Sequence, residues 1–93
     1  MEFEWDEKKR ALNLATHGID FQDATGIWGE AVLEVPSRHL LGAEQRFLAI
    51  GHLKGMAVTV VFTWRGEVRR IISARRARRD ERQEYDKAVG RDA

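Results

Sequence analysis

The stretch MAVTVVFTW, at residues 56–64, carries the strongest strand signal in the chain. Apolar and polar positions alternate along it, with Val58, Val60, Phe62 and Trp64 on one side and Thr59, Val61, Thr63 and Arg65 on the other. This period of two predicts a strand with one apolar face and one half-polar face. We expect helices to cover one face of the sheet and the half-polar face to be open.

Further strands are predicted on both sides of this stretch. QRFLAIGHL (45–53) precedes it across a tight KG turn, and VRRIISA (68–74) follows it across an RGE turn. EFEW (2–5) and AVLEV (31–35), the latter ended by Pro36, predict shorter strands. Because tight turns join antiparallel neighbours, the pattern predicts an antiparallel sheet of about four strands.

Three helices are predicted near the two ends of the chain. Asp6 is a candidate N-cap for a helix that ends at His17-Gly18, and Asp20 is a candidate N-cap for a short second helix. Residues 77–88 favour a C-terminal helix. The sequence therefore predicts one α+β domain over residues 1–93, with two N-terminal helices and a C-terminal helix.

Composition excludes several kinds of site. The 93 residues include no cysteine, which excludes disulfides and thiolate metal sites. His17, His39 and His52 lack metal-binding spacing, and no glycine-rich phosphate loop is present. There is no apolar run of about 18 residues and no signal-peptide pattern. We therefore expect a cytoplasmic protein without a membrane span, a metal ion or a cofactor.

Charge is distributed unevenly along the chain. Residues 1–40 hold four basic and eight acidic residues, whereas residues 41–93 hold twelve basic and seven acidic ones. Such asymmetry favours a surface that binds a polyanion, and it is equally typical of a helix whose charges are solvated.

The basic excess centres on RRIISARRARRDER, residues 69–82. Strand alternation places Arg69 and Arg70 on opposite faces of the sheet, where Arg65 can join one of them from the neighbouring strand. If the following residues are all helical, Arg75, Arg78, Arg79 and Arg82 form one basic stripe. Guanidinium groups on a sheet suit phosphate because each can donate two parallel hydrogen bonds.

RNA cleavage is a reaction that such a surface supports. It needs a base for the 2′-hydroxyl, an acid for the leaving oxygen and cations around the phosphorus, and it needs no metal. Candidate proton carriers are His17, Glu44, Glu81, Tyr85 and a lysine. Each also has an ordinary structural role: His17 at a helix end, Glu81 as an intrahelical partner and Tyr85 as an anchor.

Three segments combine these features: FEWDEKKRALNLATHGIDF (3–21), EQRFLAIG (44–51) and RIISARRARRDERQEY (70–85). The first contains Trp5-Asp6, Lys9, Asn13 and His17-Gly18, followed by Phe21. In these segments the chain resembles the BrnT toxins, the ribonuclease half of a bacterial type II toxin–antitoxin pair.

The resemblance implies an α+β fold like that of the RelE toxins and a metal-independent endoribonuclease that inhibits translation by cutting RNA. It implies a BrnA-like antitoxin with a ribbon-helix-helix part, joined in a heterotetramer of two toxins and two antitoxins that binds operator DNA through the antitoxin. The site residues it implies are His17, Arg70, Arg75, Glu81 and Tyr85 for catalysis, and Lys9, Arg46, Arg65, Arg76 and Arg79 for RNA binding.

Two other interpretations remain open at the level of sequence. The basic surface can belong to a binding module without chemistry, acting in a DNA-binding repressor complex. The chain can also be a folded but inactive toxin. Thr16 supports the second interpretation, because many relatives carry lysine at this position beside the histidine.

Overall fold

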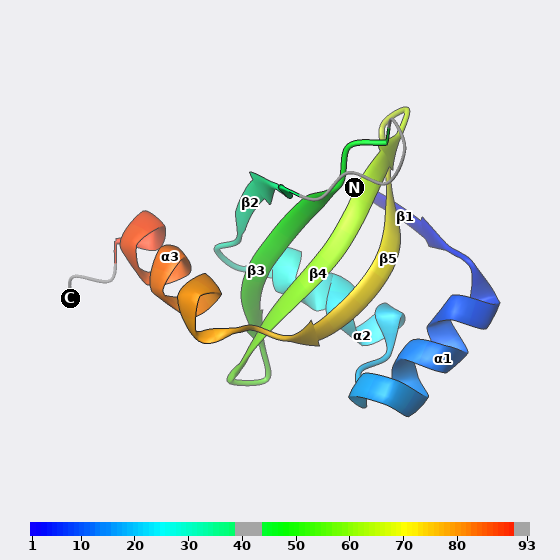
Figure 1. The fold of residues 1–93 in the computed structure, drawn as a ribbon, viewed down its shortest axis with the longest axis horizontal. Helices are drawn as coiled ribbons and strands as arrows, with labels where there is room; N and C mark the ends of the chain where they lie inside the picture. Colours follow the sequence, from blue (N-terminus) through cyan, green and yellow to red (C-terminus); the bar gives the residue numbers. More distant parts are fainter. Residues whose placement is uncertain (39–43, 91–93) are drawn as a thin grey trace.

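The computed structural model describes residues 1–38 and 44–90. Its elements follow in the order β1 (Glu2–Trp5), α1 (Glu7–His17), α2 (Phe21–Ala24), the 3-10 helix η1 (Thr25–Gly29), β2 (Leu33–Pro36), β3 (Phe47–Leu53), β4 (Met56–Arg65), β5 (Val68–Arg76) and α3 (Arg79–Val89). Figure 1 shows the central sheet with α1 and α3 at opposite ends of the molecule. The predicted α+β class is confirmed. No helix among the described residues is long and apolar enough to cross a membrane.

The sheet differs from the predicted one in strand number and direction. The described residues form five strands in the order β1-β5-β4-β3-β2, and β1 runs parallel to β5, from Glu2 opposite Val68 to Trp5 opposite Ile71. The prediction of about four antiparallel strands was therefore wrong at this edge. A parallel pair needs a long crossover, and here the whole chain between β1 and β5 supplies it.

The other strands form the expected antiparallel meander, β2 to β5. Lys54 and Gly55, between β3 and β4, both have positive φ (52° and 81°), as a two-residue type I′ hairpin turn requires. The pairing register between β4 and β5 changes after Val61. Val61 pairs with Ser73, but the next residue, Phe62, pairs with Ile71, so Ile72 has no partner on β4. Ile72 is therefore the extra residue of a β-bulge.

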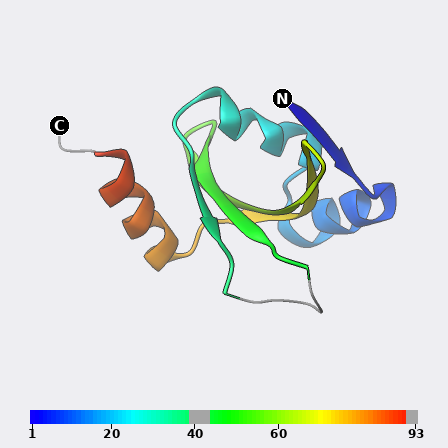
Figure 2. The same ribbon diagram turned by 90° about the horizontal axis from the view of Figure 1, so that it is seen from above.

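The strand alternation gives the sheet two different faces. The core face carries Val58, Val60 and Phe62, which pack with Phe21 and Ile27 of α2 and η1 in the main core. The opposite face, here called the groove face, carries Thr59, Val61 and Thr63 of β4 and their neighbours on the other strands. Figure 2 shows α2 and α3 on different sides of the curved sheet.

The prediction that all helices cover one face was therefore wrong for α3. Its Tyr85 forms a second small core with Ile50 and Ala77, against which Leu33 and Val89 also pack. Leu33 and Ile50 are paired across β2 and β3 and share the groove face. Their apolar side chains give α3 a place to dock on that side.

Gly51 of β3 marks the closest approach between the sheet and η1. A Cβ added at Gly51 would lie 2.9 Å from Cβ of Ile27, a side chain with no exposed surface. Glycine is required here because the two backbones approach too closely for a methyl group.

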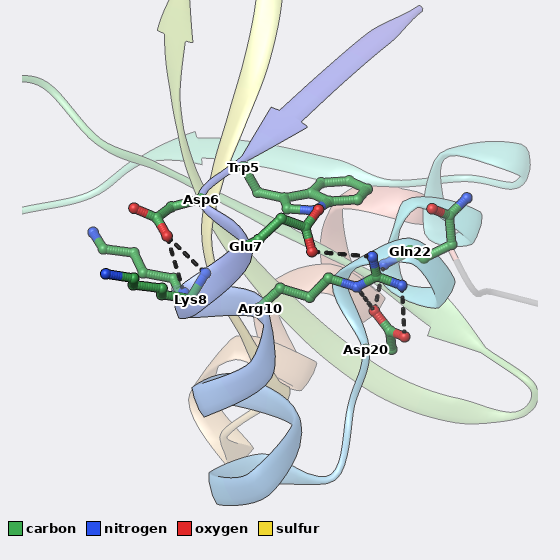
Figure 3. A network of polar contacts seen from close by, with 8 residues as sticks. Trp5, Asp6, Glu7, Lys8, Arg10, Asp20 and Gln22 are labelled. Atoms are coloured by element: carbon green, nitrogen blue, oxygen red, sulfur yellow. Dashed lines mark hydrogen bonds and ion pairs between the residues drawn. The ribbon is translucent and has the colours of Figure 1, made fainter.

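Helix α1 begins and ends where the sequence predicts. Asp6 accepts hydrogen bonds from the backbone N–H of Lys8 and Lys9, which lower the pKa of its carboxyl group, and Gly18 closes the helix in the left-handed conformation. Arg10 then ties α1 to α2 through two bonds to Asp20, at 2.7 and 3.1 Å (Figure 3). The hydrogen bond from Arg10 is the main reason that the pKa of Asp20 is lowered.

Asn13 is the buried residue of α1 and joins the helix to the edge of β5. Its side-chain Nδ2 donates to the carbonyl oxygens of Ile19 and Ala74, both at 2.9 Å, and its Oδ1 accepts from the N–H of Ala74 at 3.1 Å. β1 pairs with β5 only as far as Ile71. Beyond the end of β1, the side chain of Asn13 therefore satisfies the backbone hydrogen bonds of β5 at Ala74.

Arg69 lies on the core face among aromatic rings. Its guanidinium carbon is 4.4 Å from the ring centroid of Trp64 and 5.3 Å from that of Trp28, and its Nη2 is 2.8 Å from the Glu34 carboxylate. Arg70 lies on the groove face, opposite Thr63. The prediction that alternation separates Arg69 and Arg70 is confirmed, and Arg69 is used in packing.

The C-terminal helix starts two residues later than predicted. β5 continues to Arg76, which pairs with Val58, and the backbone N–H of Arg78 donates to the Glu81 side chain at 2.8 Å, ahead of the first helical turn. Arg75 therefore belongs to the sheet and Arg78 precedes the helix. The condition for a four-arginine helical stripe is therefore not met, because the strand ladder extends as far as Arg76.

Candidate functional site

A wide groove opens on the groove face between α3 and the strands. It has a volume of about 710 Å³. Its charged lining residues are Arg38, Arg46, Arg75, Arg78, Asp80, Glu81 and Glu84, and Val35, Leu48, Ile50 and Val61 form its apolar part. We call it the arginine groove. Of the predicted site residues, it brings together Arg46, Arg75 and Glu81.

Arg75 and Glu81 form the centre of the arginine groove. Nη1 and Nη2 of Arg75 donate to the two carboxylate oxygens of Glu81, at 2.8 and 2.9 Å. Thr59 Oγ1 also donates to this carboxylate, at 2.9 Å, and the backbone N–H of Arg78 donates to it at 2.8 Å. The carboxylate of Glu81 thus joins β4, β5 and α3 in one network.

This network controls the ionisation of Glu81. Burial of the carboxyl group alone raises its pKa, but the hydrogen bonds from Arg75, Arg78 and Thr59 outweigh that effect and lower the pKa from 4.5 to about 2. The hydrogen bonds that Arg75 donates to Glu81 in turn raise the pKa of Arg75. Glu81 is therefore an anion at neutral pH, and its carboxylate accepts four hydrogen bonds, three of them on Oε1.

Arg75 keeps donors that Glu81 does not use. A guanidinium has five N–H groups. Two of those in Arg75 donate to Glu81 and a third to the carbonyl oxygen of Arg76, at 3.3 Å. The remaining two N–H groups, on Nε and Nη2, donate to no acceptor among the described residues. They lie along a second edge of the planar guanidinium. That edge has the geometry for a bidentate contact with a phosphate.

Arg46 is a second cation that lines the arginine groove, and one of its N–H groups has no acceptor among the described residues. It lies just before β3, and its Nε is buried with no hydrogen-bond partner among the described residues. Its nearest carboxylate oxygen, on Glu44, is 3.9 Å away, beyond hydrogen-bonding distance. Because this Nε has almost no exposed surface, a ligand in the groove would be attracted by the charge of Arg46 without reaching its unsatisfied N–H.

The other predicted arginines lie outside the arginine groove. Arg70 is bonded to Glu4 of β1 at 2.7 Å, and Arg65 lies 3.8 Å from Glu44 at the end of β4. Arg76 and Arg79 are exposed at the end of β5 and the start of α3. These four side chains are at the surface around the sheet and do not line the cavity around Arg75.

His17 and Lys9 line a different groove, beside α1. It has a volume of about 370 Å³ and is lined by Lys9, Leu12, Asn13, Thr16, His17, Ile72 and Ser73. We call it the α1 groove. It shares no lining residue with the arginine groove. A catalytic role for His17 together with Arg75 stays a prediction, and the separation of the two grooves does not favour it.

Tyr85 has an anchoring position. It is buried, with 7% of its surface exposed, and its hydroxyl donates to the carbonyl oxygen of Ala31 at 3.0 Å. Its ring meets that of His52 edge to face, with centroids 5.1 Å apart. The structural role considered for Tyr85 therefore accounts for its contacts, and its catalytic role stays a prediction.

Metal binding receives no geometric support within the part of the chain that is described. No group of three or more His, Asp or Glu side chains there is placed to hold a metal ion. His39, one of the three histidines, lies outside the described residues.

Sequence reasoning missed several residues of the arginine groove. Thr59 was assigned to the half-polar face without a role, and Arg38, Asp80 and Glu84 were not singled out. The polar positions on the central strand were the available signal for Thr59. Arg38 and Glu84 come from segments far apart in sequence, so only the fold brings them together.

The chain was compared with known proteins. A family model described as "Ribonuclease toxin, BrnT, of type II toxin-antitoxin system" matches residues 5–81, which run from the last residue of β1 to the start of α3. No curated protein matches the chain.

Proposed function

Because the chain belongs to the BrnT family of ribonuclease toxins of type II toxin–antitoxin systems, we propose that it cuts RNA in the arginine groove without a metal ion. The observation that carries this proposal is the fixed guanidinium of Arg75, held by Glu81 with one edge still open. The family match supports the ribonuclease activity, and the cluster of arginines in the groove supports our assignment of that activity to this face.

In the proposed reaction, Arg75 binds two oxygens of the scissile phosphate through its open edge. Arg46 and Arg78 line the same groove and add positive charge around the phosphorus. Cations that are already in place stabilise the charge that develops in the transition state, and they do so most effectively where water is partly excluded. Glu81 acts as a positioning residue, because it fixes the plane of the Arg75 guanidinium.

Proton transfer requires a group other than Glu81. A carboxylate with a pKa of about 2 and four hydrogen bonds is a poor proton acceptor at neutral pH. Glu84, three residues further along α3, is exposed and lines the same groove. We assign the removal of the 2′-hydroxyl proton to Glu84. The 2′-oxygen then bonds to phosphorus, the bond to the 5′-oxygen breaks, and that oxygen takes a proton from water.

The test is cleavage of a defined single-stranded RNA by the purified chain in excess EDTA. We expect cleavage to persist and to leave 2′,3′-cyclic phosphate and 5′-hydroxyl ends. Arg75→Ala should slow it by about a hundredfold, the usual effect of losing a donor that stabilises developing charge. Lys87→Ala, on the exposed last turn of α3, is the control. Complete loss of activity in EDTA would rule out the metal-free reaction.

A type II toxin is inhibited by an antitoxin protein, and we propose a BrnA-like ribbon-helix-helix protein as the partner. The two would form a heterotetramer of two toxins and two antitoxins that binds operator DNA through the antitoxin, with the free toxin acting on cytoplasmic RNA and inhibiting translation. Expression of this chain alone should stop growth, and co-expression of the neighbouring open reading frame should restore it. Normal growth together with intact RNA would favour a binding module or an inactive toxin.

A further inference from the structure

The α1 groove is built from one stripe of a helix and one segment of a strand. Lys9, Asn13 and Thr16 recur at the spacing of a single helix face, and Ile72 and Ser73 form the opposite wall. The β-bulge at Ile72 brings this residue into that wall beside Ser73. The groove therefore lies between α1 and β5, beyond the point where β1 ends.

The two grooves are neighbours on one face of the sheet. Ser73 lines the α1 groove, Val61 lines the arginine groove, and these two residues pair across β5 and β4. Paired residues of neighbouring strands have Cα atoms about 5 Å apart. Arg75 follows Ser73 by two residues on the same strand and therefore points to the same face. A ligand bound at Arg75 needs to cross only one strand to enter the α1 groove.

The α1 groove offers the contacts that a nucleotide uses. The Lys9 ammonium can pair with a phosphate, and the exposed hydroxyl of Thr16 and imidazole of His17 can donate or accept hydrogen bonds. Leu12, with 67% of its surface exposed, and Ile72 provide an apolar wall for a base. Proteins that bind single-stranded RNA combine cations along an open track with aromatic side chains on which bases stack. The imidazole of His17 is the aromatic ring among the lining residues of this groove.

We infer that single-stranded RNA lies across the groove face, with its scissile phosphate at Arg75 and a nucleotide beyond the two joined by that phosphate in the α1 groove. This inference rests on the proposed function. It gives Lys9 and His17 a role in holding the substrate, away from the bond that breaks. An antitoxin segment is the other possible occupant, and RNA is favoured because the α1 groove continues the proposed phosphate site on the same face.

The test uses RNA that cannot react, because a 2′-O-methyl group blocks attack by the 2′-oxygen. Binding of a 2′-O-methyl dinucleotide and of an oligomer of about eight nucleotides is measured by fluorescence anisotropy. Lys9→Gln and His17→Gln should each weaken binding of the longer RNA by roughly fivefold and leave the dinucleotide unaffected. Lys8→Gln is the matched control, since Lys8 precedes Lys9 on the same helix and does not line the groove.

A second measurement separates the inference from the proposed function. In cleavage of a long RNA, the two groove variants should raise KM and leave kcat unchanged, because the groove acts on binding. If the wild-type chain does not cleave RNA, the proposed function fails and this inference fails with it. If the wild type cleaves RNA but the variants match Lys8→Gln in both assays, only the extended track is overturned. Weakened antitoxin binding with unchanged RNA binding would assign the groove to the protein partner.

Discussion

The guanidinium of Arg75 on β5 donates two hydrogen bonds to the carboxylate of Glu81 on α3, at 2.8 and 2.9 Å. This pair fixes the start of α3 to the sheet and orients the cation that the proposed reaction uses. Stability and the proposed activity would then depend on the same contact, and different substitutions should separate the two effects.

Substitution of Arg75 by lysine tests the need for a planar, forked donor. Lysine keeps the charge but presents a single ammonium, which cannot contact Glu81 and a phosphate with two parallel bonds each. We expect Arg75→Lys to slow RNA cleavage by roughly tenfold or more, measured as kcat under EDTA. Arg82→Lys, on α3 and outside the arginine groove, should leave the rate unchanged. Equal rates for the two variants would remove Arg75 from the site.

Glu81→Gln should change how stability depends on pH. The folded-state pKa of Glu81 is depressed to about 2, so its stabilising contribution is fully present above about pH 4.5 and is lost as the pH falls towards 2. We expect the free energy of unfolding of the variant to be lower by about 2 kcal/mol at neutral pH. This is below the range for fully buried pairs, because the Arg75 and Glu81 side chains keep 18% and 10% of their surface exposed.

The measurement is urea unfolding at several pH values between 7 and about 2.5. The difference between wild type and Glu81→Gln should shrink as the pH falls, since protonation removes the advantage of the wild type. For Glu84→Gln, exposed on the same helix, the free energy of unfolding should change with pH as it does for the wild type over this range. A constant gap for Glu81→Gln would show that the carboxylate charge is not what holds α3.

Asn13→Ala tests the junction between α1 and β5. The substitution leaves the N–H and the carbonyl oxygen of Ala74 without the partners that Asn13 supplies. An unsatisfied buried polar group costs about 1–3 kcal/mol, so we expect a loss of roughly 2 kcal/mol in urea unfolding. Gln83→Ala, on the exposed surface of α3, is the control and should change stability by less than about 0.5 kcal/mol.

Gly51→Ala tests the close approach of β3 and η1. The new methyl group would lie 2.9 Å from Cβ of Ile27, so one of the two backbones must shift. Overpacking of this kind typically costs about 1–3 kcal/mol, which should appear as a lower melting temperature. Gly29→Ala is the matched control, because nothing lies within 4 Å of a Cβ at that position. Similar melting temperatures for the two variants would contradict the packing described here.

Local signals in the sequence were sufficient for most of the elements. The N-caps Asp6 and Asp20, the C-terminal Gly18 and the turn at Lys54-Gly55 all act within a few residues, and the structure has them as expected. The alternation in residues 56–64 correctly separated the core face from the half-polar face. These features are decided by dihedral preferences and by burial, both of which can be read from neighbouring residues.

Contacts between distant residues were the part that sequence reasoning could not supply. The parallel pairing of Glu2 with Val68 spans nearly the whole chain, and nothing in EFEW specifies the direction of its partner. The bulge at Ile72 depends on the register with β4, and it determines which arginines share a face. The candidate site was therefore predicted as a set of residue types, whereas its division between two grooves required the fold.

Asn13 has a consequence for how this sheet behaves towards other chains. A strand edge with free N–H and C=O groups is a template on which a second polypeptide can add, either as a partner or as the start of an aggregate. β1 occupies the edge of β5 up to Ile71, and one amide side chain occupies it at Ala74. The side chain of Asn13 thus occupies the N–H and C=O of Ala74 that an added strand would use, and a second polypeptide could pair with this part of β5 only by displacing it.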